Sequence, residues 1–497
     1  MTERLEHLLA SQVTARPHAI ALTDSTGAKL TWADLDALSL AGCALLRDQG
    51  VRRGDRALLI IENCAEAVAL LFSCWCSGVT AVPVNARQSA SEISRVLAHA
   101  DPALVLFSTA VSENARAHAG HLGAVPAPSP FGGMHLARMH PGAPDDYPDL
   151  AVLLYTTGTT GDPKAVMLTH ENLLFGGGAS ARLRRMVPDD LIYGVLPVTH
   201  VFGLTSVIVA AVTAGAAVRL EPRFEVDRLY RALGEGITLL SAVPQMHGLL
   251  MHYTARQGYT RLGSDTLRYA SSGAAPLDPD WKRQAEAFYG MALQNGYGMT
   301  ETSAGVSITD NPAGSADTST GPPLPGVQVR IDETVPGGGD GLGEVLVRGP
   351  NVTPGYYRLP EETARVIDSA GWLHTGDLGH LDDQGRLHIL SRSKELIIHG
   401  GFNVYPPEVE AAINEHPEVM QSAVIGRAAA GDEEVLAFVQ TGSGSTLTEA
   451  ELLEFLRQRL SGYKRPAQIV FARQLPAAPT GKLLKHLLLK ELGDRLR

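Results

Sequence analysis

Residues 156–164, which read TTGTTGDPK, combine the residue types that bind a phosphate group. They directly follow the apolar run AVLLY. Glycines let successive backbone N–H groups turn toward a phosphate, hydroxyls donate to its oxygens, and Lys164 adds positive charge. The spacing is not that of a Walker loop, because Lys164 follows a proline and no Ser or Thr comes next. The segment therefore predicts a phosphate loop of another kind, with an ordinary surface loop as the alternative.

Further segments carry groups suited to a nucleoside and a metal ion. In NGYGMTE, residues 295–301, Tyr297 between two glycines offers a stacking face to a planar base, and Glu301 can hold a metal ion. The carboxylate of Asp377 in TGD can accept two hydrogen bonds from a ribose diol. Two more segments stand out, SRSKELIIHGGFNVYP at residues 391–406 and PTGK at residues 479–482. Taken alone, each of these segments also fits a simple turn.

The composition is that of an ordinary soluble globular protein with more than one domain. The chain has 497 residues, of which 44% are hydrophobic and 19% charged, which excludes a disordered chain and a small disulfide scaffold. A net charge of −11 argues against general affinity for nucleic acid or anionic lipid. Four cysteines are too few for a disulfide framework, and the N-terminus lacks the pattern of an export signal. We therefore expect a cytoplasmic protein.

Short apolar runs alternate with helical patterns, which predicts βαβ units on largely parallel sheets. The expected strands are residues 57–61, 81–84, 104–107, 152–155, 218–220 and 239–243. Two uncharged stretches, residues 67–86 and 191–218, are interrupted by Pro and Gly and are expected to be buried helix plus strand, not membrane spans. Between residues 321 and 355, short strands separated by Gly and Pro predict a small barrel or an antiparallel sheet.

In this order and at these separations, the five segments resemble those of the adenylate-forming superfamily. Its members include acyl- and aryl-CoA synthetases, adenylation domains of nonribosomal peptide synthetases, and firefly luciferases. The resemblance implies an α/β fold, with a large N-terminal domain of α/β subdomains plus a small β-barrel and a smaller, mobile α+β C-terminal domain. On this chain the N-terminal AMP- and acid-binding domain would be residues 1–391, the hinge 392–394 and the C-terminal domain 395–497.

The resemblance also implies roles for individual residues. Lys482 would bridge the acid's carboxylate and the α-phosphate, Thr300 would contact the α-phosphate, and Glu301 would hold Mg²⁺. His200 would be a gate beside the reacting groups or a plain wall of the acid pocket. The residues that would bind ATP or AMP are Thr156, Thr157, Gly158, Thr159, Thr160, Gly161, Lys164, Ser272, Gly273, Ala274, Asn295, Gly296, Tyr297, Asp377 and Arg392.

The same resemblance assigns the hinge and the acceptor side. Lys394 occupies the hinge position, and Gly400 and Gly401 would let the pantetheine arm of CoA pass close to the backbone. Lys464 is a candidate for binding the CoA phosphates, with a solvated basic turn as the alternative. The family alternates its C-terminal domain between two orientations, because adenylation and thiol transfer need different groups beside the same carbonyl.

The expected acid pocket lies between the VTHVFG segment, the SSGAAP strand and the residues after Glu301. It includes Val201, Phe202, Gly203 and Ala304, and these stretches contain no Lys or Arg to pair a second carboxylate. We therefore expect an acid that is apolar beyond its carboxyl group.

The resemblance thus implies an ATP-dependent acyl-CoA synthetase that uses ATP, Mg²⁺ and coenzyme A to activate an apolar monocarboxylic acid, fatty or aryl. One alternative is an acyl-AMP ligase that loads the phosphopantetheine of an acyl carrier protein. A catalytically inactive nucleotide-binding regulator is another alternative, although Lys482 and Glu301 are both present. The resemblance leaves a homodimer open, and no nucleic-acid partner is expected.

Overall fold

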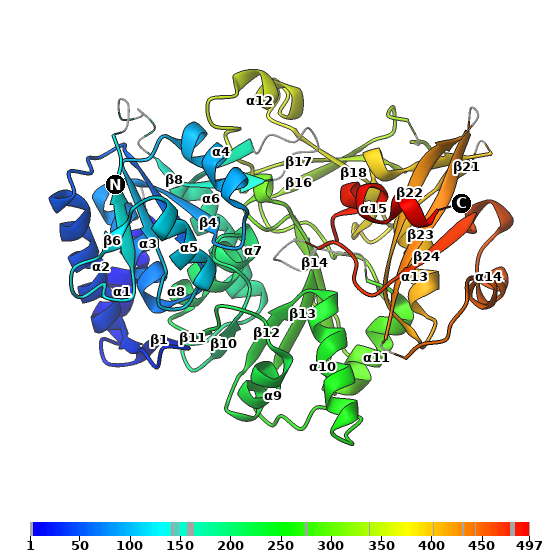
Figure 1. The fold of residues 1–497 in the computed structure, drawn as a ribbon, viewed down its shortest axis with the longest axis horizontal. Coiled ribbons are helices and arrows are strands. Elements are labelled where there is room, and N and C mark those ends of the chain that lie inside the picture. The colour runs from blue at the N-terminus through cyan, green and yellow to red at the C-terminus, as the bar shows by residue number, and fades with distance from the viewer. Residues whose placement is uncertain are drawn as a thin grey trace.

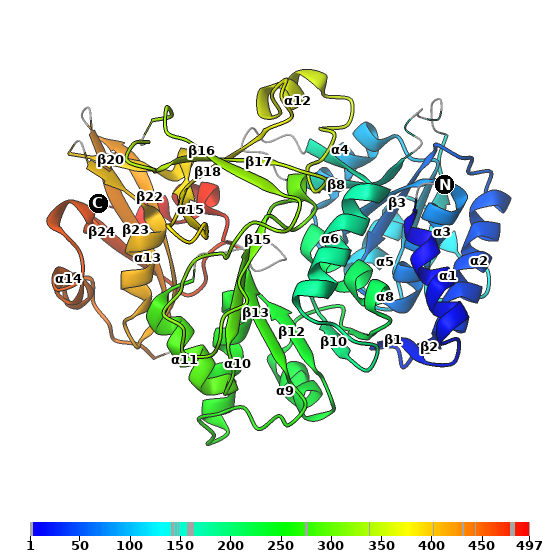
Figure 2. The same ribbon diagram turned by 180° about the vertical axis from the view of Figure 1, so that it is seen from behind.

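The computed structural model describes residues 3–140, 144, 147, 149–156, 164–273, 277–336, 338–400, 402–429, 432–442, 444–477 and 483–496. The N-terminal third of the chain forms one lobe, and residues from the centre of the sequence form the lower lobe (Figure 1). The C-terminal hundred residues form a third lobe on the opposite side from the N-terminus, as both ribbon views show (Figure 2).

The first sheet has seven strands in the order β6-β7-β5-β3-β4-β8-β9. Strands β5, β3, β4 and β8 run parallel, and the remaining pairs are antiparallel. The central strands are buried on both faces, which explains their near-continuous apolar sequence. The strands are β3 Arg56–Ile61, β4 Thr80–Asn85, β5 Leu104–Phe107, β6 Val125–Pro126, β7 His135–Arg138, β8 Leu150–Thr156 and β9 Lys164–Thr169.

Helices cover both faces of this sheet. Leu58 and Ile60 of β3 share a core cluster with the apolar residues of α4 and α5, whereas Leu59 and Ile61 pack with α1, α2 and α3 on the other face. Thr31 caps α2 by accepting from the backbone N–H of Asp34, as the ordinary N-cap pattern requires. The helices are α1 Leu5–Ala15, α2 Trp32–Asp48, α3 Ala65–Ser77, α4 Ala90–Ala100 and α5 Glu113–His121.

The second sheet has eight strands in the order β15-β14-β13-β12-β10-β11-β1-β2. All neighbours run parallel except the outer pairs β15–β14 and β1–β2. Residues from both large sheets belong to one continuous core, which includes α3 and a π-helix, η1. The strands are β1 Ile20–Asp24, β2 Lys29–Thr31, β10 Leu191–Gly194, β11 Ala217–Leu220, β12 Leu239–Ala242, β13 Tyr269–Gly273, β14 Leu293–Tyr297 and β15 Ser307–Ile308.

Seven helices and two single-turn or π-helical segments connect the strands of the middle region. They are α6 His170–Leu183, α7 Val201–Gly203, η1 Leu204–Val209, α8 Ala210–Ala214, α9 Val226–Gly234, α10 Pro244–Arg256, α11 Pro279–Tyr289, η2 Thr300–Thr302 and, further along, α12 Pro360–Val366. The uncharged residues 191–218 thus form buried strand, helix and strand, as expected. Within the described part of the chain, no helix combines the length and apolar character that crossing a bilayer requires.

The segment expected to form a small barrel or antiparallel sheet is an antiparallel sheet of four strands in the order β16-β17-β18-β19. Its inner face packs on Ala179 of α6 and Val306. The outer edge of β19 is not free, because Leu387 exchanges backbone hydrogen bonds with Thr320 and Gly321. The strands are β16 Gln328–Asp332, β17 Gly343–Arg348, β18 Leu373–Leu381 and β19 Leu387–Arg392.

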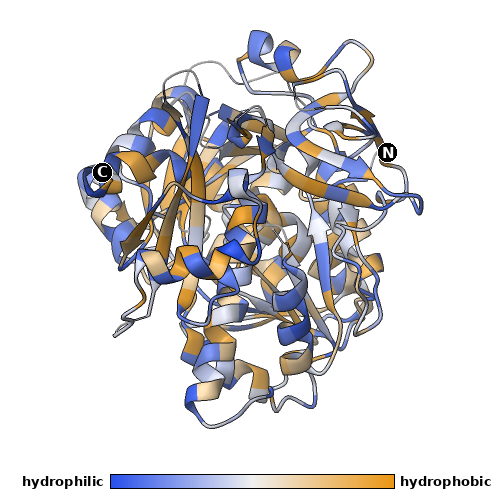
Figure 3. Cartoon of the chain, turned by 90° about the vertical axis from the view of Figure 1, so that its right-hand side faces the viewer, coloured by the Kyte–Doolittle hydropathy of each residue, from blue (hydrophilic) through white to orange (hydrophobic). Residues whose placement is uncertain are grey.

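The C-terminal lobe has its own core of α and β elements. A three-stranded sheet in the order β22-β23-β24 carries apolar clusters on both faces, and a two-stranded hairpin, β20–β21, precedes it. Hydrophobic segments lie along these strands, whereas polar segments lie on loops and outer helix faces (Figure 3). The elements are η3 Ser393–Glu395, β20 Ile397–His399, β21 Phe402–Val404, α13 Pro406–Asn414, β22 Val419–Ala429, β23 Asp432–Thr441, α14 Glu449–Arg457, η4 Gly462–Lys464, β24 Gln468–Ala472, α15 Lys485–Leu492 and η5 Gly493–Arg495.

Candidate active site

The predicted site segments follow the carboxyl ends of parallel strands. Ser272 of β13 pairs in register with Asn295 of β14 and with Ala242 of β12, so three strand ends lie side by side. In the other large sheet, Thr156 ends β8 just before the phosphate loop, and β9 returns from Lys164. Ligands of open α/β sheets bind beyond the carboxyl ends of their strands, so the topology gathers these segments at one place.

Tyr297, Asp377 and Arg392 meet although they come from two different sheets. The Tyr297 hydroxyl donates to Oδ2 of Asp377 at 2.5 Å, and Arg392 Nε lies 3.1 Å from Oδ1 of the same carboxylate. Asp377 and Arg392 are register partners on β18 and β19. Burial and the neighbouring Asp377 carboxylate raise the pKa of Tyr297 well above its usual value. The tyrosine therefore remains a hydrogen-bond donor at neutral pH.

Glu301 lies buried at the start of the turn after β14. Its Oε1 accepts a 2.8 Å hydrogen bond from the hydroxyl of Tyr356, and only 7% of Glu301 is exposed. Burial and then the Glu301 charge raise the pKa of Tyr356, so this phenol stays protonated. Lys164 lies 5.2 Å from the centre of the Tyr356 ring and pairs with Glu362 of α12. Tyr356 thus connects the proposed metal ligand to the lysine of the phosphate loop.

The turn after Glu301 has an unusual backbone. Ser303 and Ala304 have φ of +52° and +84°, values that residues with a side chain rarely adopt. The turn is held by the Ala304 N–H donating to Met299 O at 3.2 Å and by the Ser303 hydroxyl donating to Asn351 O at 2.9 Å. This geometry fixes Thr300, which is buried, and orients Glu301.

The expected adenine wall keeps buried polar atoms without a partner. Among the described residues, neither the Ser272 hydroxyl nor Oδ1 of Asn295 has a hydrogen-bond partner, although both are buried. Nδ2 of Asn295 donates to Ser319 O at 3.1 Å. Buried polar groups are normally paired, so these two atoms fit a ligand with its own polar edge, such as a purine base. Gly273 and Gly296 lie next to them as register partners.

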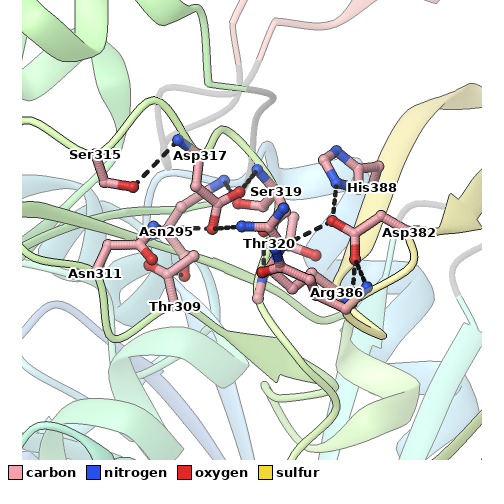
Figure 4. Close-up of polar contacts among 12 residues, drawn as sticks. Asn295, Thr309, Asn311, Ser315, Asp317, Ser319, Thr320, Asp382, Arg386 and His388 are labelled. Atoms are coloured by element: carbon pink, nitrogen blue, oxygen red, sulfur yellow. Dashed lines mark hydrogen bonds and ion pairs between the residues drawn. The ribbon is translucent and has the colours of Figure 1, made fainter.

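A polar network supports this wall from behind (Figure 4). Arg386 lies 2.7 Å from Asp382 and 3.4 Å from Asp317, and His388 lies 3.1 Å from the same Asp382 carboxylate. Asp317 also accepts from the Ser319 N–H at 2.8 Å. The network joins the strand pair β18–β19 to the segment beneath Asn295, so it holds the ribose side and the base side in one arrangement.

The expected acid pocket begins at α7, where Nδ1 of His200 accepts from the Phe202 N–H at 3.2 Å. Val201 is buried, and a Cβ on Gly203 would lie 2.2 Å from Pro197 O, so only glycine fits there. The Phe202 ring lies against β13, since a Cβ built on Gly273 would be 3.3 Å from it. The structure therefore brings the VFG segment and the end of β13 together, as expected.

Two buried residues beside this pocket were missed from the sequence. Arg184, at the end of α6, places its guanidinium carbon 5.9 Å from the centre of the Phe202 ring. His247 of α10 is fully buried between the Tyr289 hydroxyl, at 2.7 Å, and Ser271 O, at 3.1 Å. Burial lowers the pKa of His247 to about 4, so it is neutral at pH 7. Neither residue belongs to a recognisable motif, so no pattern in the sequence marked them.

The hinge and acceptor residues lie in the C-terminal part of the chain. Lys394 lies in the turn η3, directly after β19 ends at Arg392. Gly400 has φ of +59°, and its N–H lies 2.9 Å from Oδ1 of Asp432. Lys464 pairs with Glu408 at 2.5 Å. Eight predicted residues lie outside the described part of the chain: Thr157, Gly158, Thr159, Thr160, Gly161, Ala274, Gly401 and Lys482.

The chain matches known proteins over nearly its full length. The AMP-binding enzyme family matches residues 9–357, and the AMP-binding enzyme C-terminal domain matches residues 408–482. A feruloyl-CoA synthase from an Amycolatopsis species is 34% identical over 488 residues, covering 96% of each chain. The long-chain-fatty-acid–CoA ligase FadD13 of Mycobacterium tuberculosis is 31% identical over 498 residues, covering 97% of each chain.

A solved structure gives the same result. The crystal structure of ATP-bound MatB from Rhodopseudomonas palustris has a TM-score of 0.85, with 31% identity and 100% coverage of both chains. The chain therefore belongs to the AMP-binding enzyme family, within the adenylate-forming superfamily, and to its acyl- and aryl-CoA ligases, which are AMP-forming acid–thiol ligases.

Proposed function

We propose that this protein activates an apolar monocarboxylic acid, fatty or aryl, with ATP and Mg²⁺ and then transfers the acyl group to coenzyme A. The observation that carries the proposal is the meeting of Tyr297, Asp377 and Arg392 beside the strand ends that carry Ser272 and Asn295. An aromatic ring, a carboxylate and unpaired polar atoms together suit the base and the ribose of ATP. The named relatives, a feruloyl-CoA synthase and a long-chain-fatty-acid–CoA ligase, support the acid class.

Glu301 fits a magnesium ion. Mg²⁺ in nucleotide sites is held by one or two carboxylates together with phosphate oxygens and water. Glu301 supplies one buried carboxylate, of which Oε1 accepts a hydrogen bond from Tyr356 and Oε2 would be available to the ion. When bound, Mg²⁺ neutralises part of the charge on the phosphates. Lys164, beside Tyr356, adds a positive charge where the phosphate loop ends.

The chain's own groups then serve two steps. In the first, a carboxylate oxygen of the acid bonds to the α-phosphorus of ATP and the bond to the β-phosphate oxygen breaks, releasing pyrophosphate. Two anions approach each other, so Lys482 and Thr300 would stabilise the charge that builds on the α-phosphate. In the second, the CoA thiolate attacks the acyl carbonyl and AMP leaves. His200 lies at the start of α7, where it would border the reacting carbonyl.

The apolar lining supports an acid without a second charge near its carboxyl group. Val201 is buried, and Phe202 and Ala304 add apolar surface around the end of β13. A carboxylate placed against these side chains would lose its hydration without gaining a partner.

The test supplies ATP and Mg²⁺ with a panel of fatty and aryl acids, and then either CoA or a phosphopantetheinylated carrier protein. Acid-dependent pyrophosphate exchange together with acyl-CoA formation is the expected result. Exchange with acyl transfer only to the carrier protein would favour the acyl-AMP ligase. Nucleotide binding without exchange for any acid would contradict the proposal and favour a regulator.

A further inference from the structure

Arg184 is a buried cation with no anionic partner in the described part of the chain. Only 4% of the residue is exposed, and Nη1 donates to the Ser206 carbonyl oxygen at 2.6 Å. Nε is buried and has no hydrogen-bond partner, and no carboxylate of the described residues forms an ion pair with this side chain. A buried guanidinium normally has a carboxylate or several acceptors around it. The sequence neighbour Arg185 is different, because it is exposed and pairs with Asp310 at 2.7 Å.

A second unpaired donor lies next to Arg184. The guanidinium carbon lies 5.8 Å from the centre of the Tyr269 ring and 5.9 Å from that of Phe202, within the range of cation–π contact for both. The Tyr269 hydroxyl is itself buried and forms no hydrogen bond of good geometry with a described residue, although Arg184 and Ser271 lie close enough to lower its pKa against the effect of burial. Burial raises the pKa of Tyr269, so its hydroxyl keeps its proton and can donate. The Arg184 Nε–H and the Tyr269 hydroxyl are therefore two donors without a described acceptor, and Arg184 lies against the Phe202 ring of the proposed acid pocket.

These donors lie toward the amino end of β13, away from the strand end beside which the nucleotide is proposed to bind. Side chains alternate along a strand, so Tyr269, Ser271 and Gly273 share one face of β13. Gly273 is at the carboxyl end, where the nucleotide is proposed to bind, and the Phe202 ring packs against it. Tyr269 lies four residues earlier, about 13 Å along the strand. If the tail of the acid follows this face past Phe202, its far end would lie beside Arg184 and Tyr269. A substituted cinnamic acid or a medium-length alkyl chain has about the length that this requires.

We propose that Arg184 and Tyr269 bind an oxygen acceptor at the remote end of the acid's tail. The inference rests on the proposed function and changes its substrate at one place. The acid is apolar beside Phe202 but ends in a hydroxyl, an ether or, in place of the monocarboxylic acid proposed above, a second carboxylate. The Arg184 Nε–H and the Tyr269 hydroxyl donate to that oxygen. An acid that ends in a methyl group leaves both donors unpaired, and unpaired buried donors are the basis of strong discrimination between otherwise similar substrates.

The experiment compares acids of matched size that differ only at this end. The aryl series is 4-methylcinnamate, 4-hydroxycinnamate and 4-carboxycinnamate, and the alkyl series is nonanoate and 8-hydroxyoctanoate. In the series that the enzyme accepts, we expect kcat/KM for the better oxygen-ended acid to exceed that of its methyl-ended match by at least about tenfold. A preference for the carboxylate would identify the acceptor as an anion and one for the hydroxyl as a neutral oxygen, and either supports the inference.

Variants then test which side chains cause the preference. Arg184→Met should lower the oxygen-to-methyl ratio at least about tenfold, and Tyr269→Phe, which removes only the hydroxyl, should lower it less. Arg185→Met, which removes the adjacent exposed charge, should leave the ratio unchanged. Arg184 also donates a hydrogen bond to the Ser206 carbonyl oxygen, and its loss could prevent Arg184→Met from folding. In that case the same ratio is measured for Arg184→Lys and Tyr269→Phe.

A ratio near one in the wild type, or a ratio that Arg184→Met and Tyr269→Phe leave unchanged, would overturn the inference while the ligase function stands. The absence of pyrophosphate exchange with every acid would overturn the proposed function as well, so the two failures give different results.

Discussion

The proposed nucleotide side and the proposed thiol side of this enzyme hold their charged groups in different ways. On the nucleotide side the carboxylates are buried, with Glu301 7% and Asp377 3% exposed, and each is bonded to a tyrosine hydroxyl. On the thiol side the carboxylates are on the surface, with the side chains of Glu408 44% and Asp432 41% exposed.

This difference separates a prearranged site from an adjustable one. Buried hydrogen-bond networks are costly to disturb, because each broken partner leaves an unsatisfied group at low dielectric. Exposed ion pairs contribute about 0 to 1 kcal/mol and exchange with water easily. The change of orientation that we propose for the C-terminal domain between the two steps would benefit from exposed ion pairs, whereas the nucleotide would have to stay in place through both steps. The predictions below test whether sensitivity to substitution follows this division.

The largest effect is expected for Lys482→Ala. Only adenylation builds charge on the α-phosphate, so pyrophosphate exchange should fall by about 10²- to 10³-fold or more, while thioester formation from synthetic acyl-adenylate stays largely intact. Both half-reactions are measured separately, with Lys490→Ala on the neighbouring helix as the control for loss of one positive charge. Equal losses in the two half-reactions would contradict the role.

Lys394→Pro should impair thioester formation and leave adenylation intact, which is the opposite of the effect expected for Lys482→Ala. Proline at position 394, in the turn η3, would fix φ there at about −65° and would disfavour the helical conformation of Ser393, so the substitution restricts the backbone at the proposed pivot. We expect near-normal adenylate formation and a thioester step slowed by orders of magnitude, measured by rapid quench. Lys394→Ala, which keeps the backbone free, is the control. If both steps run at the wild-type rate, the pivot lies elsewhere.

Short dicarboxylic acids should be poor substrates. The second carboxylate of malonate or succinate would lie near Val201, Phe202 and Ala304 without a partner, at a cost of several kcal/mol. We expect kcat/KM at least about 100-fold below that of the better of octanoate and benzoate. A screen in which either dicarboxylate exceeds both monocarboxylates would show that the region beside the carboxyl group is polar.

Tyr356→Phe should have an intermediate effect. It removes the hydroxyl that donates to Glu301 at 2.8 Å and keeps the ring beside Lys164. Hydrogen bonds to charged groups contribute about 1.5 to 3 kcal/mol, so adenylation should slow by about tenfold or more, with a higher Mg²⁺ requirement. Tyr259→Phe, at a tyrosine that is 61% exposed, is the matched control. An unchanged Mg²⁺ dependence would mean that Tyr356 does not position Glu301.

Lys464→Ala should have the smallest effect. Lys464 is tied to Glu408 by an exposed ion pair, so its loss should raise the KM for CoA a few-fold and leave pyrophosphate exchange unchanged. Arg459→Ala breaks a comparable pair with Glu415, at 2.7 Å, and serves as the control. A loss of activity as large as that expected for Tyr356→Phe would contradict the proposed difference between a buried nucleotide side and an exposed thiol side.

The positions of several strands could be predicted from the sequence. The apolar runs at residues 57–61, 104–107 and 239–243 coincide with β3, β5 and β12, since a strand buried on both faces leaves a continuous apolar signature. The Gly- and Pro-rich region forms an antiparallel sheet, as one of the two alternatives predicted, and composition does not decide how far such a sheet closes into a barrel.

The sequence by itself determined the residue types of the chemistry and the strands that end beside them, because motif spacing and apolar periodicity are local properties of the chain. Only the tertiary structure decided that Tyr356 reaches Glu301, that Asp377 reaches Tyr297, and that Arg184 lies beside Phe202 with no carboxylate partner among the described residues. These contacts join residues that are between 18 and 80 positions apart on different elements. Their existence depends on how helices and sheets pack together, and no local pattern in the chain encodes that packing.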